Sequence, residues 1–301
     1  PVAAVVAESP ALLADAMEAV TVEYEPLPPL PTAEAALASD TRLHDGWPDN
    51  RALEVRGAVG DAARGMAEAD VVVEGRFRHP RLAAVPIETR GALAYRDGDG
   101  GALTVWASVQ NPYSVRDAIA SVLDLPAEQV RVRVPDVGGA FGPKGQVYPD
   151  EVLVAVAAWR LGRPIKWVES RREDFQSLGH DREHVHDARI GFTRDGAIAA
   201  LEDVFLADVG AYPVSGTGLN ANTVNHLPGP YRVPHYRGEG ASVVTSKAVN
   251  AAYRAAGRPE AVFVMERLMD LGARRLGLDP AELRRRHLVR PAEMPYRPGL
   301  T

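Results

Sequence analysis

The alternation of hydrophobic and polar residues is clearest in the middle of the chain. Val130, Val132 and Val134 are separated by two arginines, a period of two that predicts a half-buried strand. The alternation stops at the stretch DVGGAFGPKG, residues 136–145, where glycines allow the backbone to turn tightly and approach a ligand closely. The mostly apolar run from Pro149 to Gly162 predicts a buried helix. We therefore expect a strand, a glycine loop and a helix, with backbone N–H groups directed toward whatever lies above the loop.

Glycine loops of this kind often bind phosphate, but this one lacks both familiar fingerprints. A dinucleotide-binding loop needs G-x-G-x-x-G, and a nucleotide phosphate loop needs Gly-Lys-Ser/Thr. Here Lys144 follows Pro143 and precedes Gly145, and the first two glycines are adjacent. An ordinary tight turn between a strand and a helix therefore stays open as an alternative.

The remaining patterns predict an α+β fold with mixed sheets and packed helices. The predicted strands cover residues 2–7, 20–24, 70–77, 91–95, 103–109, 130–134, 165–168, 184–193, 197–209 and 243–245. Helices are predicted at residues 10–20, 112–123, 149–161, 259–276 and from the capping box at 279–282. Residues 31–65 show no sustained period and are interpreted as a linker, whereas the long Pro- and Gly-rich segment 210–236 is interpreted as a functional loop.

Composition narrows the class of protein. The chain has 301 residues, 46% of them apolar, which is enough for a substantial core. Its 34 basic and 40 acidic residues are interspersed and give a net charge of −6, so no basic field indicates binding to nucleic acid or to an anionic membrane. It has no cysteine, which excludes disulfides, thiolate zinc sites and iron–sulfur clusters held by this chain and suits a cytoplasmic protein. The chain begins at Pro1 inside an apolar run, and we expect that it is cut there.

Two polar residues are candidates for chemistry. Gln110 lies where a predicted strand gives way to a helix, so its amide could donate to an oxo group, although a surface glutamine is the simpler interpretation. Arg254 is framed by alanines that leave room for an anionic or carbonyl ligand, and a salt bridge is its ordinary alternative. His180, His184 and His186 are interpreted as part of a solvated strand face rather than a metal site, because charged residues interleave with them.

Three motifs, read together, carry a family resemblance. SVQNP at 108–112, DVGGAFGPK at 136–144 and AYRAAGRPE at 252–260 resemble, in this order, the molybdenum-binding large subunits of the xanthine dehydrogenase, aldehyde oxidase and aerobic carbon monoxide dehydrogenase family. The resemblance covers most of the chain from about residue 70 onward. It implies the tail of an α/β-hammerhead domain at 1–30, the linker at 31–65 and a first molybdopterin-binding domain at 66–301, with a second such domain absent.

The resemblance also implies a cofactor, partners and site residues. The implied reaction is hydroxylation of an aldehyde or N-heterocycle with oxygen from water, at molybdenum held by molybdopterin, expected in its cytosine dinucleotide form. Gln110 and Arg254 would be catalytic, and both would bind the cofactor together with the loop residues Gly139, Ala140, Phe141 and Gly142. A second molybdenum-binding domain or subunit and partner subunits that carry FAD and iron–sulfur clusters would complete an oligomeric enzyme.

Departures from the family pattern limit what the chain could do. Carbon monoxide dehydrogenases have a copper-binding cysteine where this chain has Ala255, and many xanthine and aldehyde enzymes have a glutamate where it has Gly145. CO oxidation and purine recognition are therefore not expected. The family's glutamate general base belongs to the absent second domain, so we expect the piece alone to be inactive. The alternatives are a non-catalytic assembly or cofactor-insertion protein that retains the fold, and a hydrolase that uses the histidines with zinc.

Overall fold

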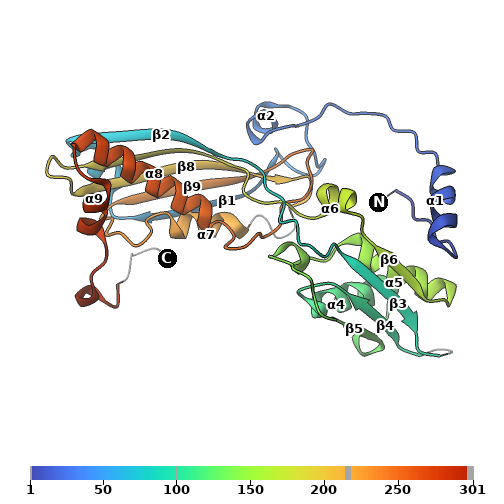
Figure 1. Cartoon of the computed structure of the whole chain (residues 1–301). Helices are drawn as coiled ribbons and strands as arrows, with labels where there is room; N and C mark the ends of the chain where they lie inside the picture. The colour runs from blue at the N-terminus through green and yellow to red at the C-terminus, as the bar shows by residue number, and fades with distance from the viewer. Residues whose placement is uncertain (1, 99–100, 214–217, 297–301) are drawn as a thin grey trace. The chain divides into compact units, whose positions relative to one another are not determined.

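The computed structural model describes residues 2–98, 101–213 and 218–296, which form two compact units (Figure 1). The first unit takes its residues from 1–28 and 84–178, and the second takes them from 29–83 and 179–301. Each unit has a mixed sheet with helices packed on it, which confirms the predicted α+β class. The candidate motifs are divided between the units: Gln110 and the glycine loop lie in the first, and Arg254 lies in the second.

The first unit is built on a four-stranded sheet with the order β5-β4-β3-β6. Its strands are β3 (Gly91–Arg96), β4 (Leu103–Ala107), β5 (Val130–Arg133) and β6 (Ile165–Val168). The β3–β4 and β3–β6 pairs are antiparallel, and β4–β5 is parallel. Its helices are α1 (Pro10–Glu18), α4 (Pro112–Leu123), α5 (Pro149–Leu161) and α6 (Arg171–Ser177), with short 3-10 turns η1 (Ala127–Gln129) and η2 (Pro143–Gly145).

Local signals account for the predicted elements of this unit. The Asn111 side chain accepts from the backbone N–H of Ser114 at 3.2 Å, so α4 begins with the predicted cap. Alternate residues of β3 and β4 and the inner faces of α4 and α5 together form one apolar core, in which Val105, Ile119 and Ala155 are fully buried. β4 leads into α4 through Gln110, and β5 leads into the glycine loop, so both candidate segments start from this core.

The second unit is built on a five-stranded sheet with the order β1-β9-β8-β7-β2. Its strands are β1 (Arg51–Val59), β2 (Val71–His79), β7 (His184–Phe192), β8 (Ile198–Gly210) and β9 (Tyr236–Val244). All neighbours are antiparallel except β8 and β9, which run parallel. The hairpin of β7 and β8 confirms the strand pair expected around the turn at 194–196.

Helices cover one face of this sheet and the ends of the other. They are α2 (Ala33–Ala38), α3 (Ala62–Ala67), α7 (Leu219–His226), α8 (Arg258–Leu276) and α9 (Pro280–His287), with the short turn η4 (Pro291–Glu293). The long α8 packs on the face that carries Ile190 and Phe192 and buries the main core of the unit (Figure 1). α3 contacts the opposite face, where Gly191 lies against Met66.

Several predictions of secondary structure were wrong. Residues 2–7 and 20–24 form no strands, because neither pairs with a neighbouring strand in the described structure, and an unpaired extended segment lacks its ladder of hydrogen bonds. Of the strand-helix-strand pattern expected at 2–24, only the helix α1 forms, and α1 buries none of its residues. The assignment of residues 1–30 to a hammerhead domain stays a prediction. Within the expected linker, residues 51–59 form the edge strand β1. Within the expected loop, residues 219–226 form α7, and residues 214–217 lie outside the described structure.

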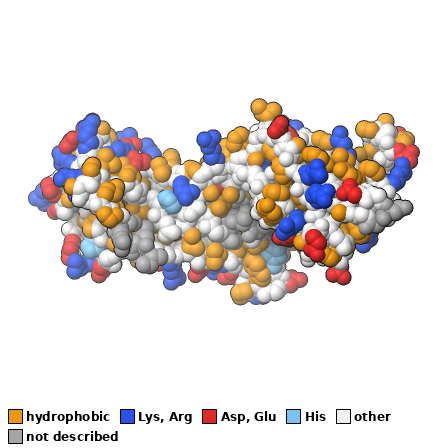
Figure 2. All heavy atoms as spheres, turned by 90° about the horizontal axis from the view of Figure 1, so that it is seen from below, with side chains coloured by type: hydrophobic (Ala, Val, Ile, Leu, Met, Phe, Trp, Pro, Cys, Tyr) orange, Lys and Arg blue, Asp and Glu red, His pale blue; other side chains and the backbone are white. Residues whose placement is uncertain are grey.

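The surface agrees with the mixed charge of the sequence. On the face drawn in Figure 2, basic and acidic side chains are interspersed among hydrophobic ones and form no large field of one sign. None of the helices within the described residues is long and apolar enough to cross a membrane.

Candidate functional site

The glycine loop of the first unit has a backbone that most side chains would not tolerate. Gly139 and Gly142 have φ angles of 101° and 114°, and Phe141 between them has a φ of 56°. A Cβ built on Gly138 would lie 2.5 Å from the Cβ of Glu88, so the loop packs too closely there for any other residue. Strained backbone of this kind persists only where its surroundings over-determine it, and it is common at ligand sites. Ala140 and Gly142 are partly exposed and Phe141 is exposed, so the loop is open to solvent on one side.

Gln110 is bound directly to this loop. Its side-chain Oε1 accepts from the Gly142 backbone N–H at 3.0 Å, and its own backbone N–H donates to the Lys144 carbonyl at 2.9 Å. The backbone N–H can only donate, so the amide atom that faces it must be the oxygen. The Nε2 amino group makes no hydrogen bond to any other described residue. This exposed amide can therefore donate to an oxygen of a ligand lying over the loop.

The buried Lys144 ammonium holds the C-terminal end of the glycine loop, and this role was not predicted from the sequence. Lys144 Nζ donates to the Ser108 hydroxyl at 2.8 Å, to the Glu88 carboxylate at 3.0 Å and to the backbone carbonyls of Glu88 and Thr89 at 2.9 and 3.3 Å. The Glu88 carboxylate also accepts from Ser108 Oγ and from the Gly138 N–H. Burial opposes ionisation of Glu88, but these donors outweigh it and lower the pKa of its carboxyl. One ion pair thus connects three separate segments of the chain around the loop.

Arg254 belongs to the second unit, where it occupies a similarly strained loop. Ala255, Ala256 and Gly257 all have positive φ angles, of 74°, 38° and 83°. The Arg254 side chain is exposed and makes no hydrogen bond or ion pair with another described residue, so its guanidinium is available to a ligand. That Arg254 and Gln110 act on the same ligand stays a prediction.

The three histidines do not form the expected solvated face. His184 and His186 are 2% and 0% exposed, because the helix α8 and Phe205 of the neighbouring strand cover this side of the sheet. His186 Nδ1 lies 2.9 Å from the Asp203 carboxylate, and burial lowers the pKa of His184 well below its usual value. Within residues 2–98, 101–213 and 218–296, no group of three or more His, Asp or Glu side chains is arranged to hold a metal ion.

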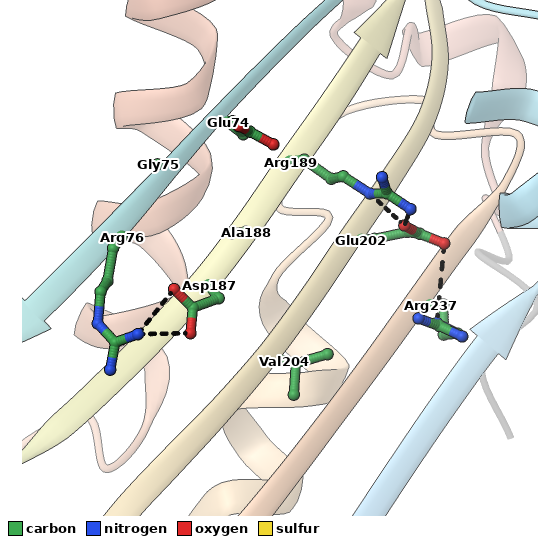
Figure 3. A pocket seen from close by; sticks show the side chains of 9 residues that line it. All are labelled: Glu74, Gly75, Arg76, Asp187, Ala188, Arg189, Glu202, Val204 and Arg237. Carbon is green, nitrogen blue, oxygen red and sulfur yellow. Dashed lines mark hydrogen bonds and ion pairs between the residues drawn. The ribbon is translucent and has the colours of Figure 1, made fainter. Parts of the chain in front are cut away.

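The opposite face of the same sheet carries a trough whose charges already satisfy one another (Figure 3). Arg76 pairs with Asp187 at 3.1 Å, and Glu202 accepts from Arg189 at 2.5 Å and lies 3.7 Å from Arg237. The basic groups are therefore neutralised within the trough. We do not consider it a candidate catalytic site.

Comparisons with known proteins agree with the motifs. Residues 43–288 match the family described as Molybdopterin cofactor-binding domain. The chain is 39% identical over its whole length to the 6-hydroxypseudooxynicotine dehydrogenase complex subunit gamma of Paenarthrobacter nicotinovorans, and it covers 38% of that protein. It is 32% identical over 94% of its length to the nicotinate dehydrogenase large molybdopterin subunit of Eubacterium barkeri, of which it covers 66%.

Solved structures show the same relationship. The crystal structure of quinoline 2-oxidoreductase from Pseudomonas putida 86 superposes with a TM-score of 0.91 at 36% identity. The match covers 96% of this chain and 37% of that one. The chain thus spans less than half the length of the Paenarthrobacter subunit and of quinoline 2-oxidoreductase.

Proposed function

This chain belongs to the family of molybdopterin cofactor-binding domains found in the xanthine dehydrogenase type of molybdenum oxidoreductase, and from that premise we propose that it forms the first cofactor-binding part of a hydroxylase large subunit. The proposed reaction adds one oxygen atom from water to a carbon–hydrogen bond of the substrate and releases two protons and two electrons. The expected substrate is an N-heterocycle or an aldehyde. When bound, the molybdenum cofactor supplies the oxygen transfer and accepts both electrons.

The observation that carries the proposal is the pairing of Gln110 with the glycine loop. The 3.0 Å bond from Gly142 leaves the Gln110 amino group as an exposed donor, which is the group that a metal-oxo ligand requires. The loop beside it has no side chain at Gly139 and Gly142, whose φ angles are positive, and its Ala140 and Gly142 are partly exposed, so a ligand can contact the backbone there. These residues fit the cofactor by their donor chemistry. Phe141, 43% exposed, would form one wall of the adjoining pocket.

Arg254 is proposed to act on the substrate. Its guanidinium is exposed and has no carboxylate partner among the described residues, so it can stabilise negative charge that develops on a bound substrate. The names of several relatives refer to nicotine, nicotinate and quinoline, which favours an N-heterocycle over an aldehyde. Ala255 provides no thiolate beside Arg254, so we do not propose CO oxidation.

The complete enzyme is proposed to need further parts. Relatives of this chain are named as subunits of complexes, and the chain has no cysteine with which to hold an iron–sulfur cluster. We therefore assign electron removal to partner subunits with iron–sulfur clusters and FAD. We assign the remaining cofactor contacts, including those to a cytosine dinucleotide, to a second molybdenum-binding domain.

The test uses the full-length subunit purified with its partners. Nicotine, nicotinate, quinoline and benzaldehyde are supplied in ¹⁸O-labelled water with ferricyanide as electron acceptor. We expect one labelled oxygen in the product and about one molybdenum per subunit. Molybdenum without turnover of any such compound would favour an assembly role, and zinc without molybdenum would favour a hydrolase.

Arg254→Ala tests the assigned role of the guanidinium. We expect kcat/KM to fall by about 100-fold or more, since removing one oriented stabilising group typically costs that much, while molybdenum content stays at the wild-type level. Arg194→Ala, at a side chain that is 91% exposed in the β7–β8 turn, is the matched control. Equal loss of molybdenum and of turnover in Arg254→Ala would mean that the arginine is structural. The isolated 301-residue chain should neither retain molybdenum nor turn over substrate.

A further inference from the structure

A second arginine lies buried beneath the Arg254 loop. The Arg182 side chain is 7% exposed, and its Nη2 donates to the backbone carbonyls of Tyr253, at 3.1 Å, and of Arg254. Its Nη1 lies 3.3 Å from both carboxylate oxygens of Glu260, and its guanidinium lies 4.9 Å above the Tyr253 ring. The adjacent Asp181 completes the arrangement by accepting from the Tyr253 backbone N–H at 2.9 Å. Arg182 therefore holds the carbonyl groups of the two residues that precede the strained Ala255 and Ala256.

The position of Arg254 has to be set through its backbone. The exposed guanidinium has no side-chain partner among the described residues, so nothing at its tip fixes its direction. The two residues that follow, Ala255 and Ala256, are in left-handed conformations that cost about 1–3 kcal/mol each for a residue with a side chain. Such a loop keeps one shape only if its neighbours enforce it. Arg182 binds the carbonyl of Arg254 itself, at the point where the strained segment begins.

The carboxylates around Arg182 hold its guanidinium in one position. Glu260 is fully buried and faces the guanidinium, and the Asp181 carboxylate lies 3.8 Å from Nη1. An arginine has a planar array of donors that can bind a carboxylate on one side and two carbonyls on the other, whereas a lysine has a single compact charge. The contacts therefore require an arginine and not merely a cation. Arg182 itself has a φ of 78°, so it too is held in a strained conformation.

We propose that Arg182, fixed by Glu260, is a positioning residue that acts through Arg254 by holding the Tyr253 and Arg254 carbonyls so that the Arg254 guanidinium points at the substrate. This inference rests on the proposed function, because it assigns Arg182 a role in the same reaction. It differs from a general role in stability, since it predicts that Arg182 matters to turnover only while Arg254 is present.

The experiment is a double-mutant cycle in the full-length subunit with its partners, assayed on whichever of the four test compounds is turned over fastest. Arg182→Lys keeps the charge opposite Glu260 but loses the planar set of donors. We expect it to lower kcat by about 10- to 100-fold, the range for displacing a reacting group by up to about 1 Å, with unchanged molybdenum content. In an Arg254→Met background the same change should have no further effect. Arg194→Lys is the control for the substitution itself.

A second measurement does not depend on turnover. Amide hydrogen exchange at Tyr253 and Ala256 should accelerate in Arg182→Lys. The Tyr253 N–H donates to the carboxylate of Asp181, next to Arg182, at 2.9 Å, and the Ala256 N–H donates to the Tyr253 carbonyl that Arg182 holds, at 2.8 Å. Exchange in the core strand β8 should stay unchanged. Glu260→Gln, which keeps the shape but weakens the hold on Arg182, should give the same pattern to a smaller degree.

The outcomes separate the two proposals. If Arg182→Lys lowers kcat equally with and without Arg254, or leaves exchange at Tyr253 and Ala256 unchanged, the positioning role is overturned while the proposed function stands. If wild-type enzyme lacks molybdenum and turns over none of the test compounds, the proposed function itself falls and the positioning role falls with it. If Arg254→Met turns over as well as wild type, the role of Arg254 and the positioning role of Arg182 are overturned, while the proposed hydroxylation stands.

Discussion

Replacing Lys144 by methionine should loosen the glycine loop and destabilise the first unit. Methionine keeps most of the length of the side chain but removes the ammonium, which is fully buried and donates to Glu88, Thr89 and Ser108. Two backbone carbonyls would then lose a donor, and the Glu88 carboxylate would lose its countercharge. The variant therefore tests whether this one cation holds the three segments together.

The expected loss in the free energy of unfolding follows from how deeply the two charged groups are buried. Breaking a fully buried ion pair costs about 3–5 kcal/mol, but Glu88 is 38% exposed and can regain water, so the electrostatic part must be discounted. An unsatisfied buried carbonyl costs about 1–3 kcal/mol, and the Glu88 carboxylate would still accept from Ser108 and Gly138. We expect a net loss of about 3 kcal/mol in the free energy of unfolding.

Urea denaturation followed by tryptophan fluorescence is a suitable assay. Trp106, Trp159 and Trp167 belong to the first unit and Trp47 to the second, so most of the signal reports the unit that is perturbed. Lys166→Met, at an exposed lysine of β6 in the same unit, is the matched control and should change stability by less than about 0.5 kcal/mol. In the full-length subunit, Lys144→Met should also reduce molybdenum content. Equal stability of the two variants, together with full molybdenum content, would refute this account of the loop.

Two further substitutions test a buried carboxyl group in the first unit and side-chain packing in the second. Glu151 is 1% exposed and 3.6 Å from Arg90, and burial raises the pKa of its carboxyl from 4.5 to about 7, with Arg90 offsetting part of the effect. Since the folded pKa is the higher one, its contribution to stability is complete below about pH 4.5 and is lost as the pH rises through about 7. Glu151→Gln should therefore flatten the fall in thermal stability between about pH 4.5 and 7. If the melting temperature of the variant depends on pH as that of the wild type does, Glu151 is not the group that titrates. In the second unit, a Cβ on Gly272 would lie 2.3 Å from the buried Phe192 ring, so Gly272→Ala should destabilise the chain by about 1–3 kcal/mol despite a better helix propensity. Gly46→Ala, with nothing within 4 Å of its Cβ, should be near neutral. For these two variants, urea denaturation is followed by far-UV circular dichroism, which reports the strands and helices of the second unit directly.

The sequence was informative wherever the signal was local. The Asn111–Pro112 helix start, the β3–β4 and β7–β8 hairpins and the glycine loop depend on residues close together in the chain, and all could be predicted. The errors arose where a distant segment decides the outcome. Residues 2–7 have the composition of a strand, but none of the described strands pairs with them. β1 is a strand because β9, far along the chain, pairs with it.

The buried polar residues could not be predicted for the same reason. His184 and His186 are flanked by Glu183 and Asp187 and look exposed, but Phe205 and helix α8 cover them. Lys144 and Arg182 look like surface cations in a list of residues. Their partners Glu88 and Glu260 are 56 and 78 positions away, so no short window of sequence contains the pair.

Lys144 and Arg182 share one physical arrangement. In each unit a buried cation pairs with a carboxylate and donates to two backbone carbonyls. Lys144 follows the positive-φ glycine loop and ties it to Glu88 and Thr89, whereas Arg182 holds the carbonyls that directly precede the positive-φ residues Ala255 and Ala256. A charge without a carboxylate partner could not be buried there, and an apolar side chain could not hold the carbonyls. The exposed Gln110 amino group and the Arg254 guanidinium are thereby left without hydrogen-bond partners among the described residues. Because each loop is held from within its own unit, the shape of either candidate segment does not have to wait for the cofactor or for a partner subunit to impose it.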